Sequence, residues 1–493
     1  MAMINSVLTE KIKANFGFTP TGEQSEAIDM IGEFLMSHRE SELFLLRGYA
    51  GTGKTTLVGA LVKALAELKW PVVLMAPTGR AAKVFSLYAE QPAYTIHKRI
   101  YRQKSATDME SFSLNVNLLK HALFIVDEAS MISNDGLSSV SSFGSGRLLD
   151  DLVQFVYSGE GCRLMLLGDT AQLPPVGEEE SPALSTRLLE SYGLNVREKT
   201  LTQVMRQLSE SGILYNATAI RYKLTAMQYG TEPDERFVEK GIVPSSDVCH
   251  VLGNELIESL EDAYSRWGAD DCMIICRSNK RANIYNLGIR NRILYREEEL
   301  CSGDRIMIVK NNYYWIEREQ RALIEDARSQ GLSEIPTLPL SFIANGDIAV
   351  VRRVRRTREM YGFRFADVLL TLPDYDDYEI ETTVLLDTLH SEAPSLTKSE
   401  ADKLFEAVME DFQDVSTKKE RFEKLRMSPY FNALQIKYAY AVTCHKAQGG
   451  QWSCVYIDKG YLPPETSPVD YHRWLYTAFT RATERVYLVN WTE

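Results

Sequence analysis

Short apolar runs that end in polar turns alternate with helical patterns through residues 1–190. A run of four apolar residues fits a buried strand, and apolar positions three or four residues apart indicate a helix. Strands alternating with helices predict an α/β fold with a parallel, doubly wound sheet. The runs and their turns are 43–46 before 48–55, 72–75 before 76–80, 123–126 before 127–130, and 164–167 before 168–175. Ligands bind such sheets at the carboxyl ends of strands, so these turns should converge on one site.

A similar pattern near the C-terminus predicts a second α/β unit. Its strand candidates are 273–276, 438–442, 455–457 and 486–489. The stretch 300–434 interrupts this unit with alternating segments at 305–310, 347–354, 363–370 and 378–385, which predict a small β domain. A charged helical segment, 398–426, follows them. Its apolar positions predict a face that packs on a neighbouring domain, and a partner-binding helix is the alternative; these positions are Leu404, Phe405, Val408 and Phe412.

Length and composition are those of a multidomain globular protein. A chain of 493 residues exceeds one ordinary core, and 45% hydrophobic with 25% charged residues is typical of soluble domains. No apolar run is long enough to span a membrane, and the N-terminus lacks the features of a signal peptide, so we expect a cytoplasmic protein. The seven cysteines form no C-x-x-C pair, which favours reduced thiols over a zinc site or disulfides.

The net charge of −12 argues mildly against nucleic-acid binding, because phosphate contacts need Lys and Arg. Acidic runs such as 374–377 account for part of that charge. A narrow basic channel can coexist with an acidic exterior, so nucleic acid remains a candidate partner.

The first polar turn, residues 48–55, is a complete G-x-x-x-x-G-K-T phosphate-binding loop between an apolar run and a helical pattern. Its glycines let backbone N–H groups close around phosphate oxygens. Lys54 can reach the β- and γ-phosphates, and the Thr55 hydroxyl can ligate Mg²⁺. The helix that follows points its positive end at the phosphates. The residues expected to bind the nucleotide are Gly48, Gly51, Gly53, Lys54, Thr55 and Thr56.

Asp127 and Glu128 directly follow the third apolar run. In phosphate-loop ATPases an Asp at this position helps to hold Mg²⁺, and a neighbouring Glu can orient and deprotonate the attacking water. Acidic residues that suit a helix dipole are the alternative. Together with Lys54 and Thr55, the acidic pair favours ATP hydrolysis.

Two glutamines are candidates for a role at the nucleotide. Gln172 ends the fourth strand pattern, where its amide could sense the γ-phosphate or the attacking water; a loop residue before Pro-Pro is the alternative. Gln24 precedes the first strand, and an amide there can read adenine with one donor and one acceptor.

Hydrolysis also needs positive charge at the γ-phosphate in the transition state. Arg206 and Arg481 are the candidates, and both lie outside the first α/β unit. Surface arginines in ion pairs are the alternative. If these residues reach the ATP, it lies in a cleft between two units, and closure of that cleft would depend on the nucleotide.

The ordered set of motifs resembles that of superfamily 1 helicases. It looks most like the 5′-to-3′ branch, superfamily 1B, with its RecD- and Dda-like members and the related Pif-type helicases. The motifs are 48–55, 76–83, 127–130, 168–176, 443–449 and 476–481, and the resemblance covers about residues 19–490.

This resemblance implies two RecA-like motor domains with ATP between them, a small β-hairpin "pin" at about 98–120, and an SH3-like insertion. Tyr101 and Phe112 are candidates for the wedge of the pin. The implied bounds are 1–195 for the first motor domain, 196–299 and 435–493 for the second, and 300–434 for the insertion with its helical segment. The adenine role of Gln24 agrees with the first motif of the family.

The resemblance also implies contacts to a DNA strand, in which hydroxyls, amides and N–H groups grip phosphates and aromatics stack bases. For His445 alone, a structural histidine would be the alternative. The implied positions are Pro77, Thr78, Arg80, Lys83, Thr95, His97, Thr443, His445 and Lys446.

We therefore expect an ATP- and Mg²⁺-dependent DNA helicase that moves 5′ to 3′ on single-stranded DNA and at duplex junctions. We expect a monomer that serves recombination, repair or replication. The alternatives are an RNA-directed member of the superfamily and an ATP-gated subunit of a larger complex like RecBCD, with protein partners.

Overall fold

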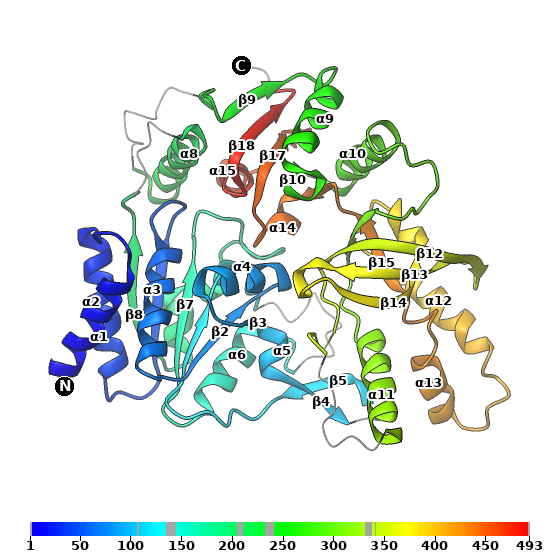
Figure 1. The fold of residues 1–493 in the computed structure, drawn as a ribbon, viewed down its shortest axis with the longest axis horizontal. Helices are drawn as coiled ribbons and strands as arrows, with labels where there is room; N and C mark the ends of the chain where they lie inside the picture. The colour runs from blue at the N-terminus through cyan, green and yellow to red at the C-terminus, as the bar shows by residue number, and fades with distance from the viewer. Residues whose placement is uncertain are drawn as a thin grey trace.

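Two parallel sheets and a small closed barrel form the framework of the chain (Figure 1). The computed structural model describes residues 2–105, 108–134, 144–204, 211–231, 241–330, 338–340 and 342–491. The predicted class, α/β with two parallel-sheet units and β insertions, is confirmed. Within the described residues, no helix has both the length and the apolar character needed to cross a membrane.

The first sheet has the order β3-β2-β6-β7-β1-β8, and every pairing is parallel. All four predicted apolar runs are strands in it. β8 also pairs with β1, so this sheet extends beyond residue 195, where the first domain was expected to end. The bounds are β1 (Glu42–Gly48), β2 (Val72–Ala76), β3 (Ala93–Thr95), β6 (Leu123–Val126), β7 (Arg163–Gly168) and β8 (Asn195–Leu201).

Helices cover both faces of the first sheet. One buried cluster joins the sheet to α1 (Ala2–Asn15), α2 (Gly22–Met36), α3 (Lys54–Glu67) and α4 (Gly79–Ala89). Another joins its opposite face to α5 (Ile96–Ile100), α6 (Leu148–Tyr157) and α7 (Thr186–Ser191), with the short turns η1 (Ala129–Met131) and η2 (Pro182–Leu184). We call this assembly the first unit.

The second sheet has the order β16-β10-β17-β18-β9 and is also parallel. Helices α8 and α15 cover one face, and α9 and α10 cover the other. We call this assembly the second unit. Its strands are β9 (Val248–Val251), β10 (Cys272–Cys276), β16 (Ala441–Thr443), β17 (Trp452–Asp458) and β18 (Ala482–Val489). Its helices are α8 (Gly212–Tyr229), α9 (Leu256–Trp267), η4 (Ala269–Asp271), α10 (Asn279–Arg292), α14 (Cys444–Ala447) and α15 (Pro468–Phe479).

A closed five-stranded barrel interrupts the second unit, as the alternating segments predicted. Its last strand begins at residue 434, where the insertion was expected to end, so the barrel extends beyond that boundary; this strand pairs with both β11 and β14. The strands are β11 (Arg305–Ile308), β12 (Ile348–Met360), β13 (Phe363–Leu372), β14 (Tyr378–Leu385) and β15 (Leu434–Tyr438). The attached helices are α11 (Tyr314–Ser329), η5 (Pro373–Tyr375), η6 (Leu386–Leu389), α12 (Lys398–Glu410) and α13 (Lys418–Arg426).

The charged helical segment packs on the barrel. Leu404 and Val408 of α12 are buried in one cluster with Phe363 and Phe365 of β13. The predicted packing face is therefore confirmed.

A hairpin leaves the first unit at the place expected for the pin. β4 (Tyr101–Ser105) pairs with the antiparallel β5 (Asp108–Leu114). Tyr101 lies buried at the base, where its hydroxyl donates to Asp151 Oδ2 at 2.7 Å. Tyr101 therefore anchors the hairpin, and its candidacy as the wedge is wrong; the side chain of Phe112 lies outside the described part.

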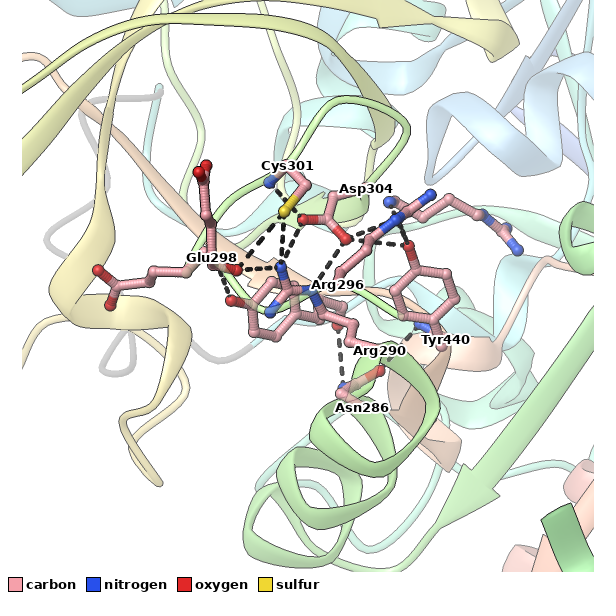
Figure 2. A network of polar contacts seen from close by, with 10 residues as sticks. Asn286, Arg290, Arg296, Glu298, Cys301, Asp304 and Tyr440 are labelled. Atoms are coloured by element: carbon pink, nitrogen blue, oxygen red, sulfur yellow. Dashed lines mark hydrogen bonds and ion pairs between the residues drawn. The ribbon is translucent and has the colours of Figure 1, made fainter. Parts of the chain in front are cut away.

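A buried polar network fixes the barrel to the second unit (Figure 2). Asp304, just before β11, accepts hydrogen bonds from Arg290 Nε at 2.9 Å and from Arg296 Nη1 at 2.7 Å. Tyr440 Oη donates to the same carboxylate and accepts the backbone N–H of Arg305 at 3.0 Å. Asp304 is fully buried, so these charge-assisted bonds make a rigid junction between α10, the entry to β11 and the segment between β15 and β16.

Candidate functional site

The phosphate-binding loop connects β1 to α3 at the carboxyl edge of the first sheet. Gly53 has φ +80° and caps α3 in the left-handed region, which favours glycine. A Cβ on Gly48 would lie 2.8 Å from Lys54 Cγ, so the close approach of backbone and lysine requires glycine there. The local sequence therefore builds the tight turn that a phosphate cradle needs.

Lys54 and the threonines occupy the first turn of α3. The Lys54 ammonium group donates to the carbonyl of Gly48 and to that of Tyr49, the latter at 3.1 Å. Thr55 and Thr56 are exposed there. These groups fit a nucleotide phosphate, because a cation, hydroxyls and the N–H groups of a helix N-terminus lie together.

Gln24 lies beside this loop, but protein atoms use both ends of its amide. Its Oε1 accepts the Thr21 N–H at 3.0 Å, and its Nε2 donates to the Thr52 carbonyl at 3.0 Å. The first contact is half of a capping box at the start of α2. Gln24 therefore ties α2 to the phosphate loop, and its adenine role stays a prediction.

The acidic pair lies at the end of β6. Asp127 Oδ1 accepts the N–H of Glu128 at 2.8 Å, and its Oδ2 accepts the hydroxyl of Tyr88 from α4. Burial, together with the charge of Glu128, raises the pKa of Asp127 to about 6, although Lys54 opposes that shift. The donor set of Asp127 and Thr55 fits one Mg²⁺ ion with water completing its shell.

Gln172 and Asp169 follow β7. The Gln172 side chain is 7% exposed, and its Oε1 has no hydrogen-bond partner among the described residues. An orphaned buried amide oxygen is costly and fits a site that a water or ligand donor completes. Asp169 Oδ1 accepts the Ala171 N–H at 2.9 Å, which shapes the turn that carries Gln172.

The second unit reaches into this site through the end of α15. Arg481 Nη1 lies 3.7 Å from Glu128 Oε1, and the Arg481 side chain is buried. Its guanidinium also donates to the carbonyls of Thr477 and Gly450, which hold it in place. The structure therefore brings Arg481 to the acidic pair, and its role at the γ-phosphate stays a prediction, while Arg206 lies outside the described residues.

Two residues of α15 that the sequence reading missed complete the contact between the units. Tyr476 Oη accepts the Ala50 N–H at 2.8 Å and donates to Asp169 Oδ2 at 2.6 Å. Thr477 Oγ1 accepts the Leu173 N–H at 2.9 Å. Both precede Arg481 by about one helical turn, so their position in the last motif was the signal that could have identified them.

The predicted strand-contacting segments of the two units also meet. Thr78 caps α4 by accepting the Ala81 N–H, and a Cβ on Gly449 would lie 3.2 Å from Thr78 Oγ1. Arg80 stacks on Trp452 at 4.2 Å and donates to the Gln451 carbonyl at 3.0 Å. Pro77 directly precedes Thr78, so this contact joins the two predicted strand-contacting segments.

The motif after β16, which ends at Gly449, also carries three predicted side chains. Thr443 precedes α14, and His445 and Lys446 lie on it, all partly buried. Burial lowers the pKa of His445, and burial with the nearby Lys437 lowers the pKa of Lys446 to about 8. Lys446 therefore keeps its positive charge at neutral pH, while His445 is neutral.

Thr95 and His97 lie around the start of α5. Thr95 Oγ1 caps the helix by accepting the Lys98 N–H at 3.2 Å. His97 packs near Tyr101 and Phe342, with ring centroids 5.7 and 6.2 Å away, and burial lowers its pKa to about 4. His97 is thus neutral and in aromatic contact.

A cavity of about 320 Å³ lies between the first unit and the barrel. Thr95, Tyr94 and Lys98 line one wall, and Tyr375 lies on the opposite one. Lys83 also lines it and donates to the Pro373 carbonyl of η5. The predicted cation Lys83 therefore contacts the barrel in this structure.

Two family models match the chain at the units just described. The AAA domain matches residues 21–230, and the UvrD-like helicase C-terminal domain matches residues 438–489. The ATP-dependent RecD2 DNA helicase of Deinococcus radiodurans is 31% identical over 196 residues, covering 40% of this chain and 23% of the relative. The dda helicase of Enterobacteria phage T4 is 25% identical over 53% of this chain and 55% of its own length. The chain therefore matches an AAA domain and a UvrD-like helicase C-terminal domain, a combination that is consistent with superfamily 1B helicases.

Other similarities extend over more of the chain. An uncharacterized protein of Acanthamoeba polyphaga mimivirus is 21% identical over 528 aligned positions, covering 90% of the chain and 94% of the relative. A solved structure of the Bacteroides Pif1 helicase with ADP-AlF3 and single-stranded DNA has 15% identity, with 96% and 93% coverage and a TM-score of 0.46. The Candida albicans Pif1 helicase has 16% identity, 96% coverage of both chains and a TM-score of 0.41.

Proposed function

We propose that this helicase hydrolyses ATP with Mg²⁺ to move 5′ to 3′ along single-stranded DNA and to open duplex junctions. The observation that carries the proposal is the approach of Arg481 to Glu128 at 3.7 Å, because these residues come from different units. Because the second unit completes the site, the rate of hydrolysis would depend on the relative position of the two units.

Each predicted catalytic residue that the structure describes has a proposed task at this site. Lys54 and Arg481 would offset the charge that develops on the γ-phosphoryl group. Glu128 would take the proton of the attacking water, and Gln172 Oε1 would accept a hydrogen bond from it. Thr55 and Asp127 would hold Mg²⁺, which shields the phosphate charge.

Movement along the strand would follow from the contact between the strand-contacting segments of the two units. Thr78 of the first unit lies against Gly449 of the second. Opening or closing of the nucleotide cleft would therefore change the distance between the two strand-contacting segments. The residues that would contact the strand are Pro77, Thr78, Arg80 and Lys83 on the first unit and Thr443, His445 and Lys446 on the second; Thr95 and His97 lie beside the pin.

The test is unwinding of one duplex that carries either a 5′ or a 3′ single-stranded tail, with ATP and Mg²⁺. Unwinding with the 5′ tail alone is the expected result, and Lys54→Ala should abolish it. Unwinding only with the 3′ tail would reject the direction. Failure of both, with ATPase activity unstimulated by single strands, would reject the motor.

DNA is favoured over RNA because RecD2 and dda are both named DNA helicases. An ATPase assay with DNA and RNA oligonucleotides of equal sequence separates the two. We further propose that the chain acts as a monomer and serves recombination, repair or replication; its mass on a tailed duplex tests the monomeric state.

A further inference from the structure

The far half of β12 forms an open edge on the barrel. β11 pairs with β12 only as far as Val350, whereas β13 accompanies β12 to Met360. The two strands therefore continue as a ribbon that extends away from the barrel, at the right of Figure 1. This half of β12 carries Arg352, Arg353, Arg355 and Arg356, which we call the arginine ribbon.

Two irregularities in the ladder turn all four arginines to solvent. The register between β12 and β13 shifts between Val351 and Arg353 and again between Val354 and Arg356. In a regular strand, side chains alternate between two faces, and a bulge breaks that alternation. Here the arginines emerge as two adjacent exposed pairs, separated by the half-buried Val354.

Half of this positive charge has no partner in the part of the chain that the structure describes. Arg355 pairs with Glu381, and Arg352 Nε donates to Thr371 Oγ1 at 2.7 Å. Arg353 and Arg356 have neither an ion pair nor a hydrogen bond from their side chains to described residues. Unpaired cations gathered on one edge contrast with a chain whose net charge is −12.

Charges on an open edge also prevent strands of other molecules from pairing with it. A few charges of either sign are enough for that task. It does not require two bulges that present four arginines together. An extended row of guanidinium groups suits a polyanion of regular spacing, and guanidinium binds phosphate oxygens in a bidentate fashion.

We propose that the arginine ribbon binds the phosphate backbone of a nucleic-acid duplex. The choice of nucleic acid rests on the proposed function. The strand-contacting segments lie where the two units meet, so the arginine ribbon supplies a separate contact. The backbone of a duplex presents a dense line of negative charge to it. The network around Asp304 fixes the barrel to the second unit, so the ribbon moves with that unit.

The experiment measures binding of a blunt duplex and of a single-stranded oligonucleotide by the full chain without ATP. Arg353→Ala with Arg356→Ala should weaken blunt-duplex binding about tenfold at low salt and reduce the slope of log K against log salt by about 1.8. Affinity for the single strand, and ATPase activity stimulated by it, should stay unchanged. Arg353→Lys with Arg356→Lys should retain much of the duplex binding, because the charge remains.

Arg39→Ala with Lys69→Ala is the matched control. Both side chains are exposed, and they lie just before β1 and β2 of the first unit and not on the barrel. Each double variant removes two positive charges, so the change in net charge is equal. Equal duplex binding and salt slope in the ribbon variant and the wild-type chain would overturn the inference, as would equal losses in ribbon and control variants. Neither outcome depends on unwinding activity, so the unwinding assay with tailed duplexes tests the motor proposal independently.

Discussion

The Tyr476 hydroxyl oxygen accepts a hydrogen bond from the backbone N–H of Ala50 at 2.8 Å. Ala50 belongs to the phosphate-binding loop of the first unit, and Tyr476 to α15 of the second. The same hydroxyl donates to Asp169 Oδ2 at 2.6 Å, and Tyr476 is 1% exposed. One buried hydroxyl therefore connects two segments of the nucleotide site to the other unit.

Tyr476→Phe should destabilise the contact between the units. The change leaves the Ala50 N–H and one oxygen of the buried Asp169 without this partner, which costs about 1–3 kcal/mol. We expect the melting temperature to fall on the order of 5 °C. Tyr471→Phe is the control on the same helix, since the Tyr471 hydroxyl has no hydrogen bond to the described residues. Equal melting temperatures for the two variants would contradict the prediction.

Arg481→Ala should slow ATP hydrolysis far more than it weakens ATP binding. A guanidinium group aimed at the γ-phosphoryl group acts mainly on the transition state, so kcat should fall about a thousandfold while KM changes little. The control is Arg473→Ala, because Arg473 of α15 also contacts the first unit, at the Glu179 carbonyl. Parallel losses of kcat in both variants would show a structural role for Arg481.

Glu128→Gln should keep ATP binding and block turnover. The amide has nearly the shape of the carboxyl group but cannot take a proton from water, so kcat should fall at least about a hundredfold. Binding of a fluorescent ATP analogue and steady-state turnover measure the two effects. Unchanged turnover would remove Glu128 as the base.

The sequence predicted the buried strands well because each is a short apolar run next to a recognisable turn. It missed β8, which reads Asn-Val-Arg-Glu-Lys-Thr-Leu, and the strand extends the first sheet beyond the expected boundary at residue 195. β8 lies at the edge of its sheet, where half-exposed positions carry polar residues. An edge strand lacks the apolar run on which the reading depended.

The candidate site was predictable where a motif is local and unpredictable where distant segments meet. Residues 48–55 form their loop from neighbouring residues alone. The bond from Tyr88 to Asp127 joins residues 39 positions apart, and that between Tyr476 and Ala50 joins residues 426 apart. Gln24 has a local contact of a different kind, because its amide oxygen completes a capping box, and its adenine role stays a prediction.

Asp304→Asn should loosen the barrel from the second unit. The substitution removes the charge that Arg290 and Arg296 share, and Arg290 is 2% exposed. Breaking a buried pair by changing one partner costs about 3–5 kcal/mol, so thermal unfolding should begin at a lower temperature. Lys120→Ala breaks the exposed pair with Glu160 and should leave the melting curve unchanged. Coincident curves for both variants would contradict the role of the network.

Asp347 should make the contact between the barrel and the first unit depend on pH. Its side chain is 2% exposed, and a Cβ on Gly79 of α4 would lie 2.8 Å from Asp347 Oδ1. Burial, with a contribution from Asp374, raises the pKa of Asp347 to about 7, although the N–H of Ala344 and the hydroxyl of Tyr375 oppose the shift.

The ionisation of Asp347 lowers the stability of the folded state as the pH rises. An unfolded Asp loses its proton near pH 4, whereas the buried carboxyl keeps it to about pH 7, so the folded state binds more protons between these values. Stability is therefore lost as the pH rises through this window, by about 1.4 kcal/mol for each pH unit, and the loss levels off above pH 7.

Asp347→Asn should remove this dependence because an amide stays neutral. Thermal melting from pH 5 to pH 9 should show the wild-type chain falling relative to the variant up to about pH 7, with a constant difference beyond it. Asp376→Asn, an exposed carboxylate in the same segment, should follow the wild-type curve. Parallel curves for wild type and Asp347→Asn would mean that this carboxyl is ionised, and tolerated, throughout.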